Sequence, residues 1–259
     1  LDAQTSVLDD YLEIRPSRRK KLEDYVKAGK LLVGPWYVQN DFYLTSGEAT
    51  VRNLLIGTKI ANDFGKCMQV GYAADQFGLC SQLPQILSRY GLDTCIFGRG
   101  FARGESQFYW ASEDGSKVLC EHMFAWYNNA QRFPADPEGA LALARMRGEA
   151  CAARGKTNNY LLMNGVDHLE AQEDLSEVIA RVQPHLKEDE AFFQDTMPEY
   201  IARVKEEIAA NGAELTTYTG EFRDLGANNV LTGTLAARIH LKQYNARCQA
   251  MLEKTFEPL

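Results

Sequence analysis

Short apolar runs alternate with amphipathic stretches along most of the chain, and this alternation limits the possible folds more than any other feature. The runs that have the character of buried strands are residues 31–38, 68–72, 94–97, 159–163, 191–193 and 214–218. Stretches with the helical spacing of apolar residues lie between them, at 46–65, 81–90, 137–154, 173–185 and 198–211. Such alternation is typical of a mainly parallel sheet covered by helices. It predicts an α/β fold and leaves both a doubly wound sheet and a barrel open.

One region departs from this alternation. Residues 106–111 and 117–121 alternate in polarity, and Asp114-Gly115 lies between them. A turn dipeptide between two such runs predicts a β-hairpin. A last helical pattern covers residues 235–255.

Length and charge exclude several classes of protein. The 259 residues suit one large domain or two modest ones and carry a net charge of −7. An acidic chain repels phosphate backbones, so we expect no nucleic-acid partner. No apolar run is long enough to cross a bilayer and no signal-peptide pattern is present, so we expect no membrane partner.

The cysteines and histidines argue against a self-contained zinc site. The 6 cysteines are scattered, without a Cys-x-x-Cys pair, which is typical of reduced thiols and predicts a cytoplasmic protein. The 4 histidines form neither a His-x-x-x-His nor a His-x-Glu pair. No zinc-binding motif is therefore complete within the sequence.

Polar side chains gather just after the predicted strands, where functional groups of parallel α/β proteins are found. They are Trp36, Tyr37, Gln39, Asp41, Asp75, Gln76, Arg99, Asn164, Asp167, His168, Glu221 and Arg223. Each has a simpler role available: Asp75 or Asp167 as a helix cap, Arg99 in a structural ion pair, Trp36 in the core. Together, two acids with an arginine and aromatic residues resemble a sugar site, because paired carboxylates cleave acetals.

Several segments, in order along nearly the whole chain, resemble the family 38 glycoside hydrolases, and most closely the bacterial branch. The matching segments are LDAQ (1–4), LDDYLEIRP (8–16), VGPWYVQ (33–39), SGEA (46–49), RNLLIG (52–57), VGYAADQFG (70–78), QLPQIL (82–87), LMNGVDH (162–168), VLTGTLAAR (230–238) and KQ (242–243). The family consists of retaining, metal-dependent α-mannosidases. The resemblance implies an α-mannoside as the substrate.

The resemblance also implies a domain organisation. The family has a distorted, mainly parallel β/α barrel-like catalytic domain followed by a helical middle domain and β-sandwich domains. Residues 1–225 resemble the catalytic domain without its first strand, and residues 226–259 resemble the beginning of the middle domain. The chain begins at Leu1 without a methionine, so we expect it to be a segment of a longer protein. A homo-oligomer formed through the other domains stays open as an alternative to a monomer.

By resemblance, Asp75 is the nucleophile and a ligand of the divalent metal, zinc in the family. Asp167 matches the acid/base, and Arg99, Trp36, Asp41 and His168 match the substrate pocket. Two positions depart from the family. Leu79 and Asn229 stand where metal-binding histidines are usual, and asparagine is a poorer zinc ligand than imidazole. We therefore expect no four-ligand zinc site within residues 1–259.

The sequence thus predicts a retaining α-mannosidase-like enzyme. Asp75 should be ionised, Asp167 should hold its proton, and the two carboxyl groups should lie roughly 5–7 Å apart in one pocket. A hydrolase of mannosylglycerate is the alternative enzyme. A carbohydrate-binding homologue that has lost its metal site and its catalysis is the alternative from another class.

Overall fold

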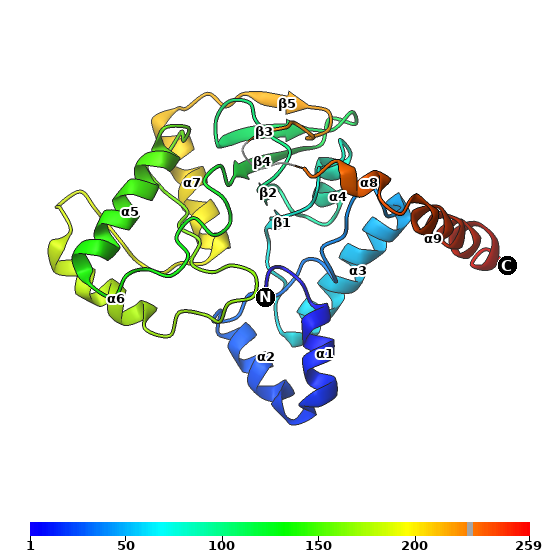
Figure 1. Cartoon of the computed structure of the whole chain (residues 1–259), viewed down its shortest axis with the longest axis horizontal. Coiled ribbons are helices and arrows are strands. Elements are labelled where there is room, and N and C mark those ends of the chain that lie inside the picture. The colour runs from blue at the N-terminus through cyan, green and yellow to red at the C-terminus, as the bar shows by residue number, and fades with distance from the viewer. Residues whose placement is uncertain (227–229) are drawn as a thin grey trace. The chain divides into compact units, whose positions relative to one another are not determined.

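The computed structural model describes residues 1–226 and 230–259 and combines helices with short strands (Figure 1). The helices are α1 (Ser6–Ile14), α2 (Arg19–Lys27), α3 (Gly47–Phe64), α4 (Leu83–Arg89), α5 (Pro137–Ala152), α6 (Leu175–Val182), α7 (Met197–Asn211), α8 (Gly233–Ala236) and α9 (Ile239–Met251). The strands are β1 (Gly71–Ala73), β2 (Thr94–Phe97), β3 (Gln107–Ala111), β4 (Lys117–His122) and β5 (Thr217–Thr219).

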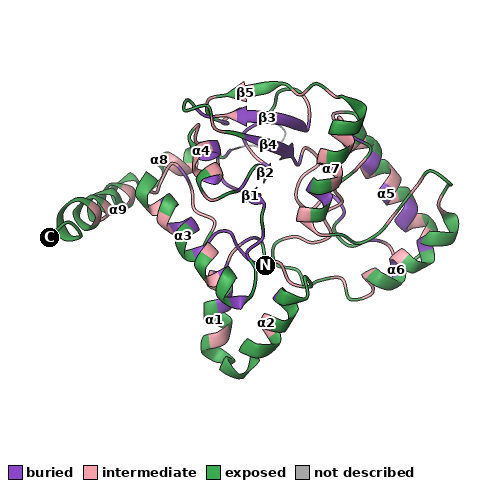
Figure 2. Ribbon diagram, turned by 180° about the vertical axis from the view of Figure 1, so that it is seen from behind, coloured by how far each residue is buried: buried purple, intermediate pink, exposed green. Residues whose placement is uncertain are grey.

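The strands form one sheet in the order β1-β2-β4-β3-β5. β1 and β2 are parallel, with Gly71 opposite Cys95. β3 and β4 are neighbours joined by residues 112–116. That connection is too short for a parallel crossover, so the two strands form the hairpin predicted from Asp114-Gly115. The predicted α/β class is confirmed, with parallel pairing of β1 and β2. Figure 2 shows that β1, β2, β3 and β4 are largely buried.

Two compact units divide the chain. The first comprises Leu1–Ala102, Trp110–Leu119 and Thr217–Leu259, and the second comprises Arg103–Tyr109 and Cys120–Thr216. The boundary expected after residue 225, between a catalytic and a middle domain, stays a prediction.

In the first unit, α1, α2 and α3 share an apolar core. Its buried members are Leu8, Val26, Val33, Ala61, Phe64 and Cys67. The start of α3 is set by Ser46, whose hydroxyl accepts a hydrogen bond from the backbone N–H of Ala49. Gly65, with φ of 140°, ends the helix.

Helix α3 also fixes the segment that carries Trp36. The side-chain Oδ1 of Asn53 accepts hydrogen bonds from the backbone N–H groups of Tyr37 at 2.8 Å and Val38 at 3.1 Å. Its Nδ2 donates to the Val38 carbonyl at 2.6 Å. Three backbone groups outside any sheet ladder are satisfied in this way, so the chain that follows the buried Trp36 is held without a neighbouring strand.

Replacing Gly57 with alanine should strongly destabilise the protein. A Cβ at Gly57 would lie 2.2 Å from the carbonyl carbon of Trp36 and 2.3 Å from the Pro35 oxygen, and backbone atoms cannot rotate away. We expect a loss of about 3 kcal/mol or more, measured by urea denaturation of the full-length protein. Gly47→Ala in the same helix is the control, because among the described residues a Cβ there meets no atom within 4 Å. Equal denaturation midpoints would contradict the prediction.

In the second unit, α5 and α6 pack on a separate core. Its buried members are Ala130, Phe133, Ala140, Leu141, Ala144, Val178 and Val182. Helix α5 begins where Asp136 accepts a hydrogen bond from the backbone N–H of Gly139 at 2.6 Å.

Three of the predicted strands are wrong: residues 31–38, 159–163 and 191–193 run without a strand ladder. In the second of these segments, Asn129 takes the place of a neighbouring strand. Its side chain donates to the Leu161 carbonyl at 2.9 Å and accepts from the Met163 N–H at 2.7 Å. The Phe192 carbonyl of the third segment likewise accepts from the side chain of Gln183 at 2.7 Å.

In the first of the three, Pro35 lacks an N–H donor, and the segment contributes an isolated bridge between Trp36 and Gln4. Two further strands are displaced along the chain. The predicted 68–72 is observed as Gly71–Ala73, and 214–218 is observed as Thr217–Thr219.

Candidate active site

Asp75 and Arg99 form an ion pair where β1 and β2 end. The two strands are parallel neighbours, so the residues that follow them emerge at the same edge of the sheet. Arg99 Nε donates to Asp75 Oδ1 at 2.6 Å, and Arg99 Nη2 lies 2.5 Å from the same oxygen. The Arg99 side chain is 13% exposed and that of Asp75 is 39% exposed. A carboxylate is thus presented to solvent while a largely buried guanidinium holds it in place.

The alternative role of Asp75 as a helix cap does not apply. Helix α4 begins at Leu83 and its N-cap is Gln82. The guanidinium of Arg99 also lies 5.2 Å from the centroid of the Phe77 ring, a cation–π contact. Arg99 therefore contacts the chain on both sides of Gln76 and orders the turn that carries Asp75.

Gln76 itself is buried beside the acid, with 5% exposure. Neither its Oε1 nor its Nε2 has a hydrogen-bond partner among the described residues. Its backbone carbonyl accepts from the Gly78 N–H at 2.8 Å, which closes a tight turn after Asp75. The first unit therefore buries an unpaired amide directly next to a half-exposed acid.

Leu79 follows this turn and lies in the core. It pairs with Phe222 through two backbone hydrogen bonds, of 3.0 Å and 2.9 Å. Both side chains are fully buried. The position where the family usually has a histidine thus holds an apolar anchor for the end of the turn.

Trp36 is placed in the core of the first unit, 1% exposed. Its indole N–H donates to the Tyr72 carbonyl of β1 at 2.7 Å, and its ring meets that of Phe42 edge-on at 5.8 Å. The indole supports β1, two residues before the loop that leads to Asp75. Its predicted contact with the substrate stays a prediction.

Asp41 shapes the loop that follows Trp36. Its Oδ1 accepts from the Tyr43 N–H at 3.0 Å, and its carbonyl accepts from the Thr45 hydroxyl at 3.0 Å. A short aspartate side chain that bonds the backbone two residues ahead is a common way to stabilise a turn. In this structure Asp41 directs Tyr43 toward the turn after Asp75.

Asp167 and His168 lie in the second unit, in a loop after the extended segment 159–163. Asp167 Oδ2 accepts from the Tyr127 hydroxyl at 3.1 Å. Asp174 is the residue before α6, so Asp167 is not its cap. His168 has φ of 65°, in the left-handed region, and is exposed. Asp75 and Asp167 belong to different units, and their separation of about 5–7 Å stays a prediction.

Sequence reasoning missed Tyr43. Its hydroxyl lies 2.8 Å from Glu221 Oε2 and 3.1 Å from the Leu79 carbonyl. Both Glu221 and Arg223 were expected near a strand end, but nothing local in the sequence pairs them with Tyr43. An aromatic residue two positions after Asp41 was the available signal.

The described residues do not make up a metal site. Among residues 1–226 and 230–259, no group of three or more His, Cys, Asp or Glu side chains is arranged to hold a metal ion. Asp75, the expected ligand, is engaged by Arg99. Asn229, the other expected ligand position, lies outside the described residues.

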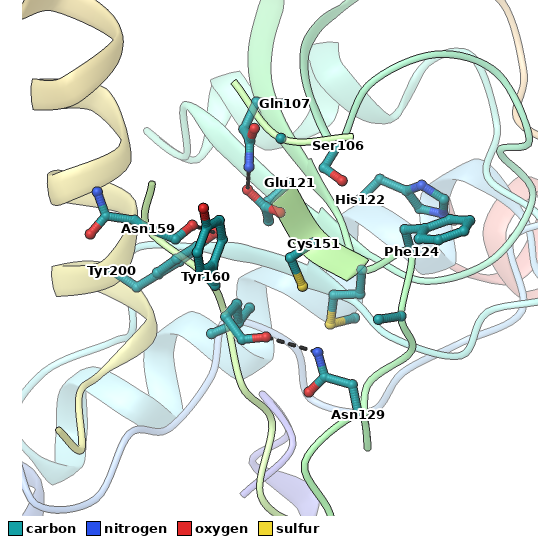
Figure 3. A pocket seen from close by; sticks show the side chains of 14 residues that line it. Ser106, Gln107, Glu121, His122, Phe124, Asn129, Cys151, Asn159, Tyr160 and Tyr200 are labelled. Carbon is teal, nitrogen blue, oxygen red and sulfur yellow. Dashed lines mark hydrogen bonds between the residues drawn. The ribbon is translucent and has the colours of Figure 1, made fainter. Parts of the chain in front are cut away.

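A cavity in the second unit is lined by polar and apolar residues (Figure 3). Its volume is about 20 Å³, which leaves room for about one water molecule and not for a sugar. Glu121 faces it and is fully buried, accepting from Gln107 Nε2 at 2.7 Å and from the Tyr200 hydroxyl. Burial raises the pKa of Glu121 to about 7, although these two hydrogen bonds oppose the shift.

This cavity gives the protein a predicted pH dependence of stability. The pKa of Glu121 is higher in the folded state than its ordinary value of 4.5. The contribution of Glu121 to stability should therefore be greatest below that ordinary value and fall as pH rises to about 7, by up to about 3 kcal/mol. Glu121→Gln should remove this fall and be more stable than the unchanged protein at pH 8. Urea denaturation at pH 5 and pH 8 measures the difference. Glu206→Gln, exposed on α7, is the control.

Comparison with known proteins places this chain in a family. The profile "Glycosyl hydrolases family 38 N-terminal domain" matches residues 1–221. The chain therefore belongs to glycosyl hydrolase family 38.

Named relatives and solved structures agree with this assignment. A protein of Halalkalibacterium halodurans named "Putative mannosylglycerate hydrolase" is 36% identical over 276 aligned residues, which cover 100% of this chain and 30% of the relative. The crystal structure of an alpha-mannosidase from Enterococcus faecalis V583 matches 97% of this chain and 29% of its own, with 35% identity and a TM-score of 0.89. Alpha-mannosidase 2C1 of Mus musculus is 32% identical over 111 residues, 40% of this chain and 11% of the relative.

The chain spans about 30% of the length of the Halalkalibacterium relative that it matches throughout. Of the helices in the part of the chain that the structure describes, none has both the length and the apolar character needed to cross a membrane.

Proposed function

We propose that the full-length protein is a retaining glycosidase that cleaves α-mannosidic bonds. The observation that carries this proposal is the Asp75–Arg99 pair: a half-exposed carboxylate held at the end of β1 in a chain of glycosyl hydrolase family 38. A retaining glycosidase needs such a carboxylate as its nucleophile. The related alpha-mannosidase from Enterococcus faecalis supports the substrate class.

In the proposed mechanism, an oxygen of Asp75 attacks the anomeric carbon and forms a covalent glycosyl-enzyme. Asp167 gives its proton to the departing oxygen, so the aglycone leaves as a neutral alcohol. Asp167, now a carboxylate, takes a proton from water. The resulting hydroxide displaces Asp75 from the sugar and restores both acids, with two inversions and overall retention.

The surrounding residues have supporting roles in this proposal. Arg99 holds the carboxylate of Asp75 in place. The Tyr127 hydroxyl orients Asp167 through its hydrogen bond of 3.1 Å. Trp36, Asp41 and His168 complete the proposed substrate pocket. Zinc is the proposed cofactor of the full-length protein, to be established by metal analysis.

Mannosylglycerate is a second candidate substrate. The relative from Halalkalibacterium halodurans that matches 100% of this chain carries a name for that activity. Mannosylglycerate and an aryl α-mannoside differ in the leaving group. Glycerate carries a negative charge that the aryl leaving group of a simple test substrate lacks. The same two acids would cleave both substrates.

The test is an assay of the full-length protein with an aryl α-mannoside and with mannosylglycerate, alongside zinc analysis. We expect hydrolysis of an α-mannoside, with the α-anomer as the first product by NMR. An aryl β-mannoside is the control and should not be cleaved. Mannoside binding without turnover would instead identify a carbohydrate-binding homologue. Inversion of configuration would overturn the proposed mechanism.

A further inference from the structure

Tyr43 connects two parts of the first unit that are far apart in sequence. Its hydroxyl lies 2.8 Å from Glu221 Oε2 and 3.1 Å from the Leu79 carbonyl. The guanidinium of Arg223 covers its ring at 4.6 Å. The pKa of Tyr43 is raised well above its ordinary value of 10, mainly because the hydroxyl is buried and secondly because it donates a hydrogen bond to Glu221. The hydroxyl is therefore a hydrogen-bond donor at every pH at which the protein works.

The ring of Tyr43 also packs on the turn after Asp75. Gly78 in this turn has φ of +114°, and a Cβ there would lie 2.9 Å from Tyr43 Cε2. The ring and the backbone of the turn are therefore in close contact, and the turn adopts a conformation that glycine permits. Because Gly78 is three residues after Asp75, this contact limits how far the carboxylate can move.

The strap, which we define as residues 221–224, contacts this same turn. Phe222 of the strap pairs with Leu79 through two backbone hydrogen bonds, of 3.0 Å and 2.9 Å. The Phe222 side chain is fully buried and stacks on Trp110, with ring centroids 4.2 Å apart. The strap is therefore anchored in the core and offers the turn a fixed support.

The strap also contacts the loop after Arg99. The Asp224 N–H donates to the Gly100 carbonyl at 2.8 Å. A Cβ at Gly100 would lie 2.2 Å from the Phe222 oxygen, so the two backbones meet closely. One short segment thus contacts the chain next to both members of the Asp75–Arg99 pair.

We propose that Tyr43 is a positioning residue for the Asp75–Arg99 pair. Its hydroxyl ties the turn after Asp75 to Glu221 of the strap, and the strap ties that turn to the loop after Arg99. This inference rests on the proposed role of Asp75 as nucleophile. Attack on a sugar carbon requires close alignment, and a displacement of about 1 Å can slow a reaction about a hundredfold.

Tyr43→Phe tests this role because it keeps the ring on Gly78 and removes only the hydroxyl. The full-length protein is inactivated with a fluorosugar that traps the glycosyl-enzyme, and the maximal rate is separated from the inhibitor affinity. We expect the maximal rate to fall about tenfold or more, with little change in affinity, because alignment and not binding is lost. Tyr90→Phe is the matched control, since its hydroxyl donates at 2.7 Å to the Val51 carbonyl in the same unit.

Variants of Glu221 give a second reading if Tyr43→Phe does not fold. Glu221→Gln keeps an acceptor oxygen and should slow trapping less than Glu221→Leu. If Glu221 had a purely structural role, these substitutions would change the fraction of folded protein but not the trapping rate per folded molecule. Trapping as fast in Tyr43→Phe as in the unchanged protein would overturn the inference. Failure of the unchanged protein to be labelled at Asp75 would instead overturn the proposed function.

Discussion

Replacing Asp75 with asparagine should abolish formation of the glycosyl-enzyme in the full-length protein. The amide has nearly the same shape as the carboxylate but is not a nucleophile at the anomeric carbon. It also leaves the guanidinium of Arg99, which is 13% exposed, without its anionic partner. We expect kcat/KM for an aryl α-mannoside to fall by about a thousandfold or more, whether the leaving group is good or poor.

Peptide mass spectrometry after fluorosugar trapping is the direct measurement, and the label should be on Asp75. Asp63→Asn is a suitable control because that acid pairs with Lys59 on the surface of α3, with a side chain 51% exposed. Exposed pairs contribute little, so the control should retain its activity. A label on another residue, or full activity of Asp75→Asn, would remove Asp75 from the role of nucleophile.

Replacing Asp167 with asparagine should produce a loss that depends on the leaving group. Substrates with poor leaving groups need a proton on the departing oxygen, and their glycosylation step should slow about 10²- to 10⁴-fold. Substrates with good leaving groups, such as dinitrophenyl mannosides, leave without that proton. Their first step should be nearly unchanged, and the covalent intermediate should accumulate because no base activates water. Rapid-quench kinetics across a series of aryl mannosides measures the two steps separately.

Asp189→Asn, in the exposed connection between α6 and α7, controls for the loss of a carboxylate from the second unit. Added azide should restore turnover in Asp167→Asn, since a small anionic nucleophile needs no base. An equal loss on good and poor leaving groups would show that Asp167 does not act as the acid. No such loss on any substrate would remove it from the mechanism.

Local sequence patterns predicted the elements that depend on local physics. The helical spacing of apolar residues predicted the stretches 46–65 and 137–154, which are observed as α3 and α5, and the Asp114-Gly115 turn marked the hairpin. In contrast, residues 159–163 have the apolar character of a strand but are satisfied by the side chain of Asn129. Periodicity cannot show which distant group supplies a hydrogen bond.

In the candidate site, too, the sequence predicted the residues that depend on local pattern and missed the one that depends on a distant partner. The position of Asp75 and Arg99 after β1 and β2 followed from the parallel pairing of adjacent strands, which the sequence pattern predicted. Tyr43 was missed because Glu221, its partner, is 178 residues away in the chain. A contact of that kind depends on the whole fold of the unit and leaves no trace in local spacing.

The buried amide of Gln76 places a cost in stability directly beside the proposed nucleophile, Asp75. An unpaired buried polar group costs roughly 1–3 kcal/mol, and an apolar side chain of similar shape, such as methionine, would have no such group to leave unpaired. Selection for thermal stability alone would therefore favour an apolar replacement of Gln76. The gain would come directly beside Asp75, whose alignment depends on the same turn. Engineering this chain for higher thermal stability would therefore change a residue directly beside the proposed nucleophile. At that position a gain in thermal stability trades off against catalytic turnover.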